Sequence, residues 1–178
     1  MNQPSSGLTL ALQVFLAVVA AQRVGELVLS RRNAKRVRMR GARELSPGHF
    51  PFIIVVHVLF FVSLAGEVLL MGARPNRWWP LWLALWLAAQ ALRYSAVRAL
   101  GDRWNTRIVV VPGEAPVTTG PYRFVRHPNY LAIVVEFVAG SLLFGAWRTA
   151  IAISLLNAIA LRIRIRAENA ALDAAAAS

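Results

Sequence analysis

The chain has 178 residues, of which 57 % are hydrophobic, with a mean hydropathy of +0.52 and a formal net charge of +12. Its apolar runs are long enough to cross a bilayer, which takes about 20 helical residues, so the composition predicts an integral membrane protein. The absence of cysteine excludes disulfides, a thiolate nucleophile and a cysteine metal site.

Apolar segments follow one another along the chain at residues 8–29, 51–71, 78–100, 129–145 and 148–165. The last two come from one apolar block that is broken near residues 144–149. At about 1.5 Å of rise per residue, this block is long enough for two short helices joined by a tight turn. The sequence therefore predicts an all-α fold, a single membrane domain over residues 1–178 with five transmembrane helices that ends in a helical hairpin.

The two ends of the chain carry further expectations. The first apolar segment has no basic region before it and continues into residues 23–40 instead of a small-residue cleavage site, so we expect a retained span and not a signal peptide. The alanine-rich residues 171–178 are expected to fray. The basic residues 31–44 suit anionic headgroups, whether they form an amphipathic helix on the membrane surface or a charged loop.

The basic residues predict the orientation, since cytoplasmic loops of membrane proteins carry an excess of Lys and Arg. Fifteen lie on one side of a five-span chain: Arg31, Arg32, Lys35, Arg36, Arg38, Arg40, Arg43, Arg98, Arg103, Arg107, Arg123, Arg126, Arg162, Arg164 and Arg166. Three lie on the other: Arg74, Arg77 and Arg148. The N-terminus is therefore predicted outside and the C-terminus inside. This topology, with anionic headgroups, explains the charge more simply than nucleic acid does.

Polar residues within the predicted spans concentrate in the cytoplasmic halves: Gln22, Arg23, Glu26, His57, Gln90, Arg93, Tyr94 and Glu136. Ionisable groups at membrane depth usually face a bundle interior or a wet cavity, so these residues predict a pocket that opens to the cytoplasm. The alternative is that they are mutual ion pairs that hold the helices together, Arg23 with Glu26 in particular.

Two other groups of side chains have a structural interpretation. The tryptophans at the start of the third span are predicted to form an interfacial belt and not a ligand cage: Trp78, Trp79, Trp82 and Trp86. The three histidines show no helical or zinc-finger spacing, so no metal site is predicted: His49, His57 and His127.

Proline and glycine mark the stretch before the fourth span as a cytoplasmic loop that enters the membrane at residues 127–130. Pro128 is predicted to start the fourth helix, with His127 near its cap. A helix N-terminus attracts a carboxylate, and Arg126 strengthens that field.

A polar stripe is predicted on the last helix, where Asn157, Arg164 and Glu168 lie seven and four residues apart. Arg162 and Arg166 fall on a separate stripe. A ligand that matches a helix N-terminus, an anion and aromatic rings carries a carboxylate, a cationic centre and a flat base. S-adenosylmethionine is one such molecule.

Two motifs carry a resemblance to a known family. Residues 120–130, GPYRFVRHPNY, are followed 34 residues further on by residues 164–172, RIRAENAAL. The pair resembles the isoprenylcysteine carboxyl methyltransferase family of membrane methyltransferases, marked by R-H-P-x-Y before a helical hairpin and then R-x-x-x-E-E-x-x-L. Two positions depart from the pattern: Asn169 replaces the second glutamate, and Leu131-Ala132 follows the motif tyrosine where eukaryotic members commonly have glycine.

Three further stretches resemble one bacterial branch of that family: QRVGELVLSRRNAKRVRMRGARE, HFPFIIVVHVLFF and RWNTRIVVVPG. That branch methylates alkylpyrones and alkylresorcinols, lipids made by type III polyketide synthases. The resemblance implies O-methylation of an enol or phenol hydroxyl on a long-chain lipid, with S-adenosylmethionine as cofactor. It also implies a bacterial inner membrane location, an acceptor that enters laterally from the bilayer, and functional pairing with a type III polyketide synthase.

The resemblance also implies the site residues. Those expected at the cofactor come from elements 102–130 and 157–172: Tyr122, Arg126, His127, Pro128, Tyr130, Arg164 and Glu168. Candidates for the base that accepts the hydroxyl proton are Glu136, Glu168 and His57, in that order, with Arg164 also expected at the catalytic centre. Their structural alternatives are a helix-packing contact for Glu136, a salt bridge to Arg164 for Glu168, and a core histidine bonded to a backbone carbonyl for His57.

Two other functions stay open at this point. One is carboxyl methylation of a prenylcysteine, which would need a cation such as Arg93 or Arg164 against the charged acceptor. The other is a non-catalytic lipid-binding or scaffold protein that has kept the pocket.

Overall fold

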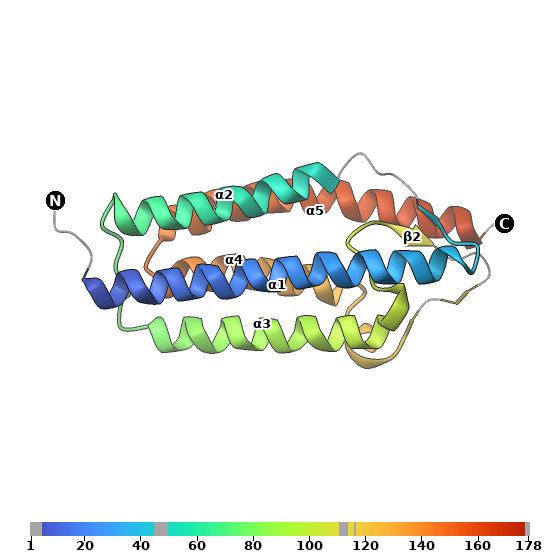
Figure 1. Cartoon of the computed structure of the whole chain (residues 1–178), viewed down its shortest axis with the longest axis horizontal. Coiled ribbons are helices and arrows are strands. Elements are labelled where there is room, and N and C mark those ends of the chain that lie inside the picture. Colours follow the sequence, from blue (N-terminus) through green and yellow to red (C-terminus); the bar gives the residue numbers. More distant parts are fainter. Residues whose placement is uncertain (1–4, 45–49, 111–113, 116, 177–178) are drawn as a thin grey trace.

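Five long helices run alongside one another over the length of the molecule (Figure 1). They are α1 (Ser6–Arg38), α2 (Phe50–Leu69), α3 (Trp79–Leu100), α4 (Pro128–Leu143) and α5 (Trp147–Ala176). The computed structural model describes residues 5–44, 50–110, 114–115 and 117–176, so His49 lies outside the described residues. The predicted all-α class is confirmed. By length and composition, α1 and residues 51–69 of α2 could cross a membrane, and α4 is a shorter apolar helix.

Helix α1 continues past the predicted end of the first span and through the basic stretch to Arg38. One face of this extension, formed by Ser30, Asn33 and Val37, is buried, so tertiary packing supports the helix beyond its apolar part. Helix α5 also runs on, to Ala176. The expected fraying of the tail is therefore wrong over residues 171–176.

The predicted hairpin of α4 and α5 is present, and a turn at residues 144–146 closes it. Gly145 has a φ of 71°, and a Cβ at this position would lie 1.9 Å from the Arg74 carbonyl oxygen, so the turn requires glycine. The buried carboxylate of Glu67 accepts hydrogen bonds from the backbone N–H groups of Arg148 (3.1 Å) and Thr149 (2.7 Å). Glu67 thereby stabilises the first turn of α5.

Aromatic rings fill the core of the bundle. The ring centroid of Phe15 lies 5.3 Å from that of Trp86 and 5.2 Å from that of Phe144. The ring centroids of Phe60 and Phe137 are 5.0 Å apart. These rings join α1, α2, α3 and the α4–α5 turn in one cluster of buried side chains.

The four tryptophans at the start of α3, of which Trp78 is the N-cap, do not share one environment. Trp78 and Trp79 are exposed, as a lipid- or interface-facing belt requires. Trp86 is only 9 % exposed and contacts Phe15 of the core, so its assignment to the belt is wrong. Trp86 lies two turns further along α3, on the side that faces the bundle.

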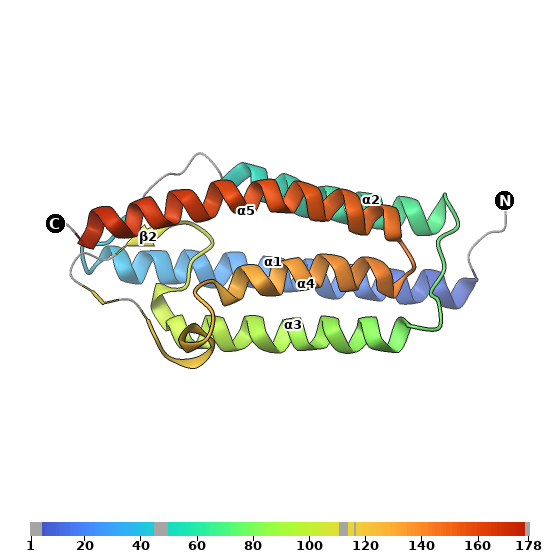
Figure 2. The same ribbon diagram turned by 180° about the vertical axis from the view of Figure 1, so that it is seen from behind.

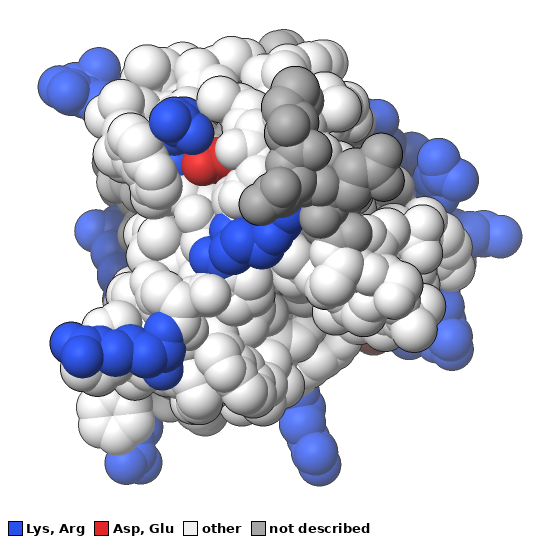
Figure 3. Space-filling view, turned by 90° about the vertical axis from the view of Figure 1, so that its left-hand side faces the viewer, with Lys and Arg blue, Asp and Glu red and all other residues white. Residues whose placement is uncertain are grey.

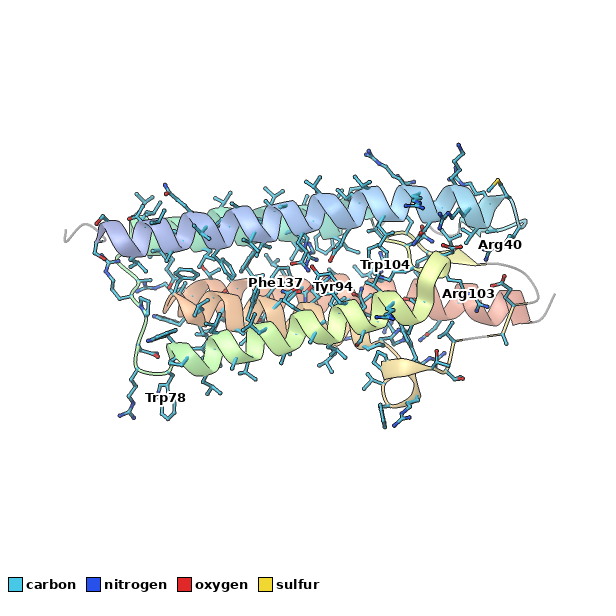
Figure 4. All side chains as sticks on the ribbon, turned by 60° about the horizontal axis from the view of Figure 1, so that its bottom comes forward. Arg40, Trp78, Tyr94, Arg103, Trp104 and Phe137 are labelled. Carbon is cyan, nitrogen blue, oxygen red and sulfur yellow. The ribbon has the colours of Figure 1, made fainter. Side chains whose placement is uncertain are left out.

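The two ends of the bundle differ in charge. Figure 3 looks onto the end with the α2–α3 and α4–α5 connections, where most of the visible surface is uncharged and basic side chains are scattered. In Figure 4, Trp78 lies at this end, and Arg40 and Arg103 lie at the other. The second end also holds the basic last turn of α1 with Lys35 and Arg36. Basic residues thus gather at one end of the bundle, which is the pattern from which the orientation was predicted. The orientation in the membrane itself stays a prediction.

Short elements close the basic end of the bundle. Strands β1 (Arg43–Glu44) and β2 (Val109–Val110) pair antiparallel, with Arg43 opposite Val110. The 3₁₀ helices η2 (Gly101–Arg103) and η3 (Gly120–Arg123) lie in the chain between α3 and α4. Seen from behind, β2 lies beside the C-terminal part of α5 (Figure 2). Within the described residues, the loop from α3 to α4 thus contacts α1 through η2, α3 through η3 and α5 through β2.

Candidate functional site

A cavity of about 350 Å³ lies among α1, α2, α4 and α5. Its apolar wall is formed largely by α1 and α2: Ala20, Leu27, Ile53, Ile54, Val58 and Phe61. Its polar residues come from six different segments, the five α-helices and the loop after η2: Arg23, Glu26, His57, Arg93, Asn105, Thr106, Asn129, Asn157 and Arg164. An apolar cavity of this size with a few polar groups has the properties of a small-molecule site.

The polar residues predicted to line a pocket divide into two groups. Arg23, Glu26, His57 and Arg93 border the cavity. Four do not border it: Gln22, Gln90, Tyr94 and Glu136. The Tyr94 residue is 57 % exposed on the outer face of α3, which departs from the prediction.

The loop after η2 forms a roof over the cavity through Trp104, Asn105 and Thr106. In Figure 4, Trp104 is labelled between the ribbons of α1 and α3. The Asn33 amide on α1 donates to the carbonyl oxygens of Trp104 (2.8 Å) and Gly101 (3.1 Å). The extension of α1 therefore holds the roof in place.

A second set of contacts between α1 and this loop lies nearer the surface. The Thr106 backbone N–H donates to the Ser30 hydroxyl at 3.0 Å. Arg36 and Arg40 donate to the Asp102 carboxylate at 2.8 and 3.0 Å, and the hydrogen bond from Arg36 is the main reason that the pKa of Asp102 is lowered. Sequence reasoning missed this function of the basic stretch, because its partners lie more than 60 residues away.

Four charged side chains of α1, α3 and α4 form an ion-pair network beside the cavity. The Arg93 guanidinium donates from Nε to Glu136 Oε1 at 2.7 Å, from Nη2 to Glu136 Oε2, and from Nη1 to Glu26 at 3.3 Å. Arg23 contacts Glu26 at 3.0 Å through Nη1 and Glu136 at 3.4 Å through Nη2. Two cations and two anions therefore balance. The sequence left two interpretations for these residues, mutual ion pairs or the lining of a pocket. Both are correct, because all four residues form ion pairs and three of them, Arg23, Glu26 and Arg93, also border the cavity.

A polar cluster joins the start of α4 to α5. The structure places His127 at the N-cap of α4 and Pro128 in its first turn, as predicted. Arg164 Nε donates to the Tyr130 hydroxyl at 2.8 Å, and that hydroxyl donates to the Glu168 carboxylate. The Tyr130 hydroxyl thus links Arg164 and Glu168, for which a direct salt bridge was the structural alternative.

The cluster also presents an aromatic surface and unpaired polar atoms. The His127 ring stacks on Tyr130 with centroids 5.2 Å apart. Three buried polar atoms of residues in the cluster or next to it in the chain have no hydrogen-bond partner: His127 Nε2, Asn129 Oδ1 and Asn169 Oδ1. Buried polar atoms without partners are rare in folded proteins and point to a ligand or a water molecule. With the Arg164 cation and the Glu168 anion, these groups suit the carboxylate, the amine and the base of S-adenosylmethionine.

The remaining predicted cofactor residues lie in the loop before α4. Tyr122 in η3 is half-buried, and burial followed by the negative charge of Glu168 raises the pKa of its phenol. Arg126 is exposed. Its positive charge helps to lower the pKa of His127, although burial is the larger cause and the Glu168 charge acts in the opposite direction. The Arg126 charge therefore acts on His127 through its electrostatic field.

The three candidate bases occupy different places. His57 borders the cavity, and its Nδ1 lies 2.8 Å from the Ile53 carbonyl oxygen. Because a carbonyl oxygen only accepts, Nδ1 carries the hydrogen and the neutral ring has its lone pair on Nε2. The contact expected for a structural histidine is thus present, and it also prepares Nε2 to accept a proton.

The other two candidates already have partners. Glu136 does not border the cavity, and Arg93 binds both of its carboxylate oxygens. Glu168 accepts from Tyr130 in the cluster. These placements favour a positioning role for Glu136 and a ligand-binding role for Glu168. The assignment of the base stays a prediction, and His57 is now the first of the three candidates.

The chain is similar to known proteins over nearly its whole length. The uncharacterized protein YpbQ of Bacillus subtilis (strain 168) is 43 % identical over 160 residues, which cover 90 % of this chain and 95 % of that protein. An uncharacterized protein of Haemophilus influenzae is 26 % identical over 165 residues, covering 92 % of this chain and 96 % of that protein. Residues 82–174 match the isoprenylcysteine carboxyl methyltransferase (ICMT) family. Since this match spans more than half of the chain, the protein belongs to that family of membrane methyltransferases, which use S-adenosylmethionine.

Proposed function

We propose that the protein transfers a methyl group from S-adenosylmethionine to a hydroxyl of a membrane-soluble polyketide lipid, an alkylresorcinol or alkylpyrone. One observation carries this proposal. The apolar cavity shares a wall with the polar cluster, because Asn129, Tyr130 and Arg164 border the cavity while Tyr130 and Arg164 also belong to the cluster. A lipid head in the cavity would therefore lie next to a cofactor held by the cluster.

The cluster would hold the cofactor on the cytoplasmic side of the bundle. His127, Tyr130 and Glu168 offer a stacked ring pair, an unpaired nitrogen and a carboxylate. When bound, S-adenosylmethionine supplies a methyl group on a positively charged sulfur. The chain positions the acceptor against it and excludes water, which accounts for much of the rate of such a transfer.

The proton of the acceptor hydroxyl needs a destination. His57 borders the cavity with a lone pair on Nε2, so it can take that proton as the oxygen becomes a nucleophile. The Ile53 carbonyl fixes this tautomer from the other side of the ring. An enol or phenol is acidic enough that a neutral imidazole suffices as base.

A lipid chain would enter the cavity between α1 and α2. Ala20, Ile54 and Val58 border the cavity and are also exposed on the outer surface of their helices, with Ile54 44 % and Val58 54 % exposed. The cavity wall thus reaches the surface that faces lipid in a five-span arrangement. We propose this arrangement in a bacterial inner membrane, with the N-terminus outside and the basic end in the cytoplasm.

A hydroxyl acceptor suits the site better than a prenylcysteine carboxylate. All three nitrogens of Arg93 contact glutamate oxygens, and Arg164 Nε is bonded to Tyr130. Both residues border the cavity, but two glutamates already compensate the charge of Arg93, and Arg164 already binds Tyr130. The proposed acceptors also imply functional pairing with a type III polyketide synthase, which makes such lipids.

The test is a parallel assay on the purified protein in lipid nanodiscs. Radiolabelled S-adenosylmethionine is supplied with a 5-alkylresorcinol, a 6-alkyl-4-hydroxy-2-pyrone or N-acetyl-farnesylcysteine, and methylated lipid is quantified. We expect product from the resorcinol or the pyrone. Product from the prenylcysteine alone would establish the carboxyl methyltransferase instead.

Variants test the cofactor site and the proposed base separately. Arg164→Ala and Glu168→Ala should remove cofactor binding or turnover, whereas His57→Gln should retain S-adenosylhomocysteine binding and lower turnover by about 10²-fold. Binding of S-adenosylhomocysteine without transfer to any lipid would favour a scaffold protein. Wild-type turnover in both α5 variants would refute the assignment of the cofactor site.

A further inference from the structure

The two guanidiniums of the ion-pair network are not equivalent. Every nitrogen of Arg93 donates to a glutamate. Arg23 contacts Glu26 and Glu136 through its two terminal nitrogens, while its Nε is buried and has no partner. Because Glu26 and Glu136 fix its ends, the position of the Nε–H donor beside the cavity is fixed as well.

The roof of the cavity holds an unpaired acceptor. The Asn105 amide nitrogen donates to the Arg103 carbonyl oxygen at 3.2 Å, which settles the orientation of the amide group. Its Oδ1 is buried without a partner, and Asn105 borders the cavity. The residues that border the cavity therefore carry one unpaired donor, Arg23 Nε on α1, and two unpaired acceptors, Asn105 Oδ1 on the roof and Asn129 Oδ1 in the first turn of α4 next to Tyr130.

A buried donor and a buried acceptor without partners each cost free energy, unless a bound molecule satisfies them. A molecule that satisfies both offers an oxygen that accepts a hydrogen bond and a hydroxyl that donates one, as two oxygens on one ring do. The rest of it must suit the apolar wall of α1 and α2. An alkyl chain on an oxygenated ring has this composition, whereas a hydrocarbon or a fully etherified ring does not.

We propose that Arg23 Nε and Asn105 Oδ1 bind the head of the acceptor and select lipids whose ring carries at least two oxygens, one of them a free hydroxyl. This inference rests on the proposed function, because it names the property by which that acceptor is recognised. Arg93, Glu26 and Glu136 act as positioning residues that hold Arg23 in place. A site of this kind discriminates strongly against analogues that leave its polar atoms unpaired.

The test measures lipid binding without the cofactor, so it does not depend on methyl transfer. Wild-type protein in nanodiscs is titrated with radiolabelled 5-pentadecylresorcinol, 3-pentadecylphenol, 1,3-dimethoxy-5-pentadecylbenzene and pentadecylbenzene. We expect the resorcinol to bind most tightly. Each lost hydrogen bond should weaken binding by about 3- to 10-fold.

Two pairs of variants assign the effect to the named atoms. Arg23→Lys keeps a cation between Glu26 and Glu136 but removes the Nε–H donor, and Arg98→Lys is the matched change on the exposed face of α3. Asn105→Ala removes the acceptor, whereas Asn105→Asp retains an oxygen there. Asn105→Ala should bind the resorcinol no better than the dimethyl ether, because no acceptor is left for the hydroxyl proton. Arg23→Lys should bind the resorcinol no better than 3-pentadecylphenol, because no donor is left for the second oxygen. Arg98→Lys and Asn105→Asp should keep the wild-type preference.

The outcomes separate this inference from the proposed function. Equal binding of all four lipids to the wild type, or an unchanged preference in both Arg23→Lys and Asn105→Ala, would show that water satisfies these atoms and would overturn the inference. Methyl transfer could still occur in that case. A preference that depends on Arg23 and Asn105 in a protein that transfers no methyl group would support the inference and contradict the proposed function. Should Arg23→Lys fail to fold, the two Asn105 variants decide alone.

Discussion

Two buried polar clusters meet on α4 and differ in how their members are satisfied. The network around Glu136 pairs two arginines with two glutamates, so its charges balance within the protein. The cluster around Tyr130 joins Arg164 to Glu168 through one hydroxyl and has unpaired atoms beside it, including His127 Nε2. A balanced network can hold three helices together without a ligand. The second cluster has unpaired polar atoms that a ligand could satisfy.

The difference also concerns what each cluster contacts. The Glu136 network links α1, α3 and α4, which are not neighbours in the chain. The Tyr130 cluster links α4 and α5, which the hairpin turn already joins. Damage to the first should therefore act mainly on stability, and damage to the second mainly on ligand binding.

The largest expected effect comes from breaking the balanced network. Arg93→Met leaves Glu136 buried without its bidentate partner, at a cost of about 3–5 kcal/mol in the free energy of unfolding. Thermal unfolding in detergent measures the loss. The double variant Arg93→Met with Glu136→Leu should recover much of it, because no uncompensated charge remains. A double variant less stable than both single variants would contradict the view that charge balance matters here.

The Tyr130 cluster should give a different result. Tyr130→Phe removes the hydroxyl that links Arg164 to Glu168 and should weaken S-adenosylhomocysteine binding about 10-fold or more. Its effect on unfolding should be smaller than that of Arg93→Met, since the hydroxyl is neutral. Calorimetric titration and thermal unfolding measure the two quantities. Tyr94→Phe, on the exposed face of α3, is the matched control and should leave both unchanged.

The sequence predicted the Tyr130 cluster better than the network for a physical reason. The cluster is built from a local motif at the start of one helix and from residues of the next, so spacing and resemblance placed His127, Tyr130 and Arg164 together. What the sequence could not give is that the Tyr130 hydroxyl lies between Arg164 and Glu168. That detail depends on how α4 packs against α5.

The network and the roof depend on contacts between distant segments. Arg23 and Glu26 could be paired from their spacing on one helix, but nothing in the sequence showed that Arg93 and Glu136 complete the set. In the same way, the hydropathy pattern ended the first span at residue 29. The helix continues because Asn33 bonds the loop after α3, a contact that no local pattern contains.

The smallest expected effect is an electrostatic one on the Tyr130 cluster. Burial lowers the pKa of His127 below the ordinary value of 6.5, the charge of Glu168 opposes this, and the charge of Arg126 adds to it. A lowered pKa means that the folded protein prefers the neutral ring. Its contribution to stability is therefore present above pH 6.5 and is lost as the pH falls through the lowered pKa. Arg126→Gln removes one of the lowering charges, so the pKa of His127 should rise.

Selective ¹³C labelling of histidine, with His127→Gln to assign the signal, lets this titration be followed by NMR. Arg123→Gln is the matched control, since Arg123 is also exposed on the same loop but is not among the causes of the shift. The rise in Arg126→Gln should shrink at high salt, because an exposed charge is screened. An unchanged titration of His127 in Arg126→Gln at low salt would mean that the field of this motif arginine does not reach the Tyr130 cluster. Its place in the motif would then need another explanation, such as direct contact with a bound ligand.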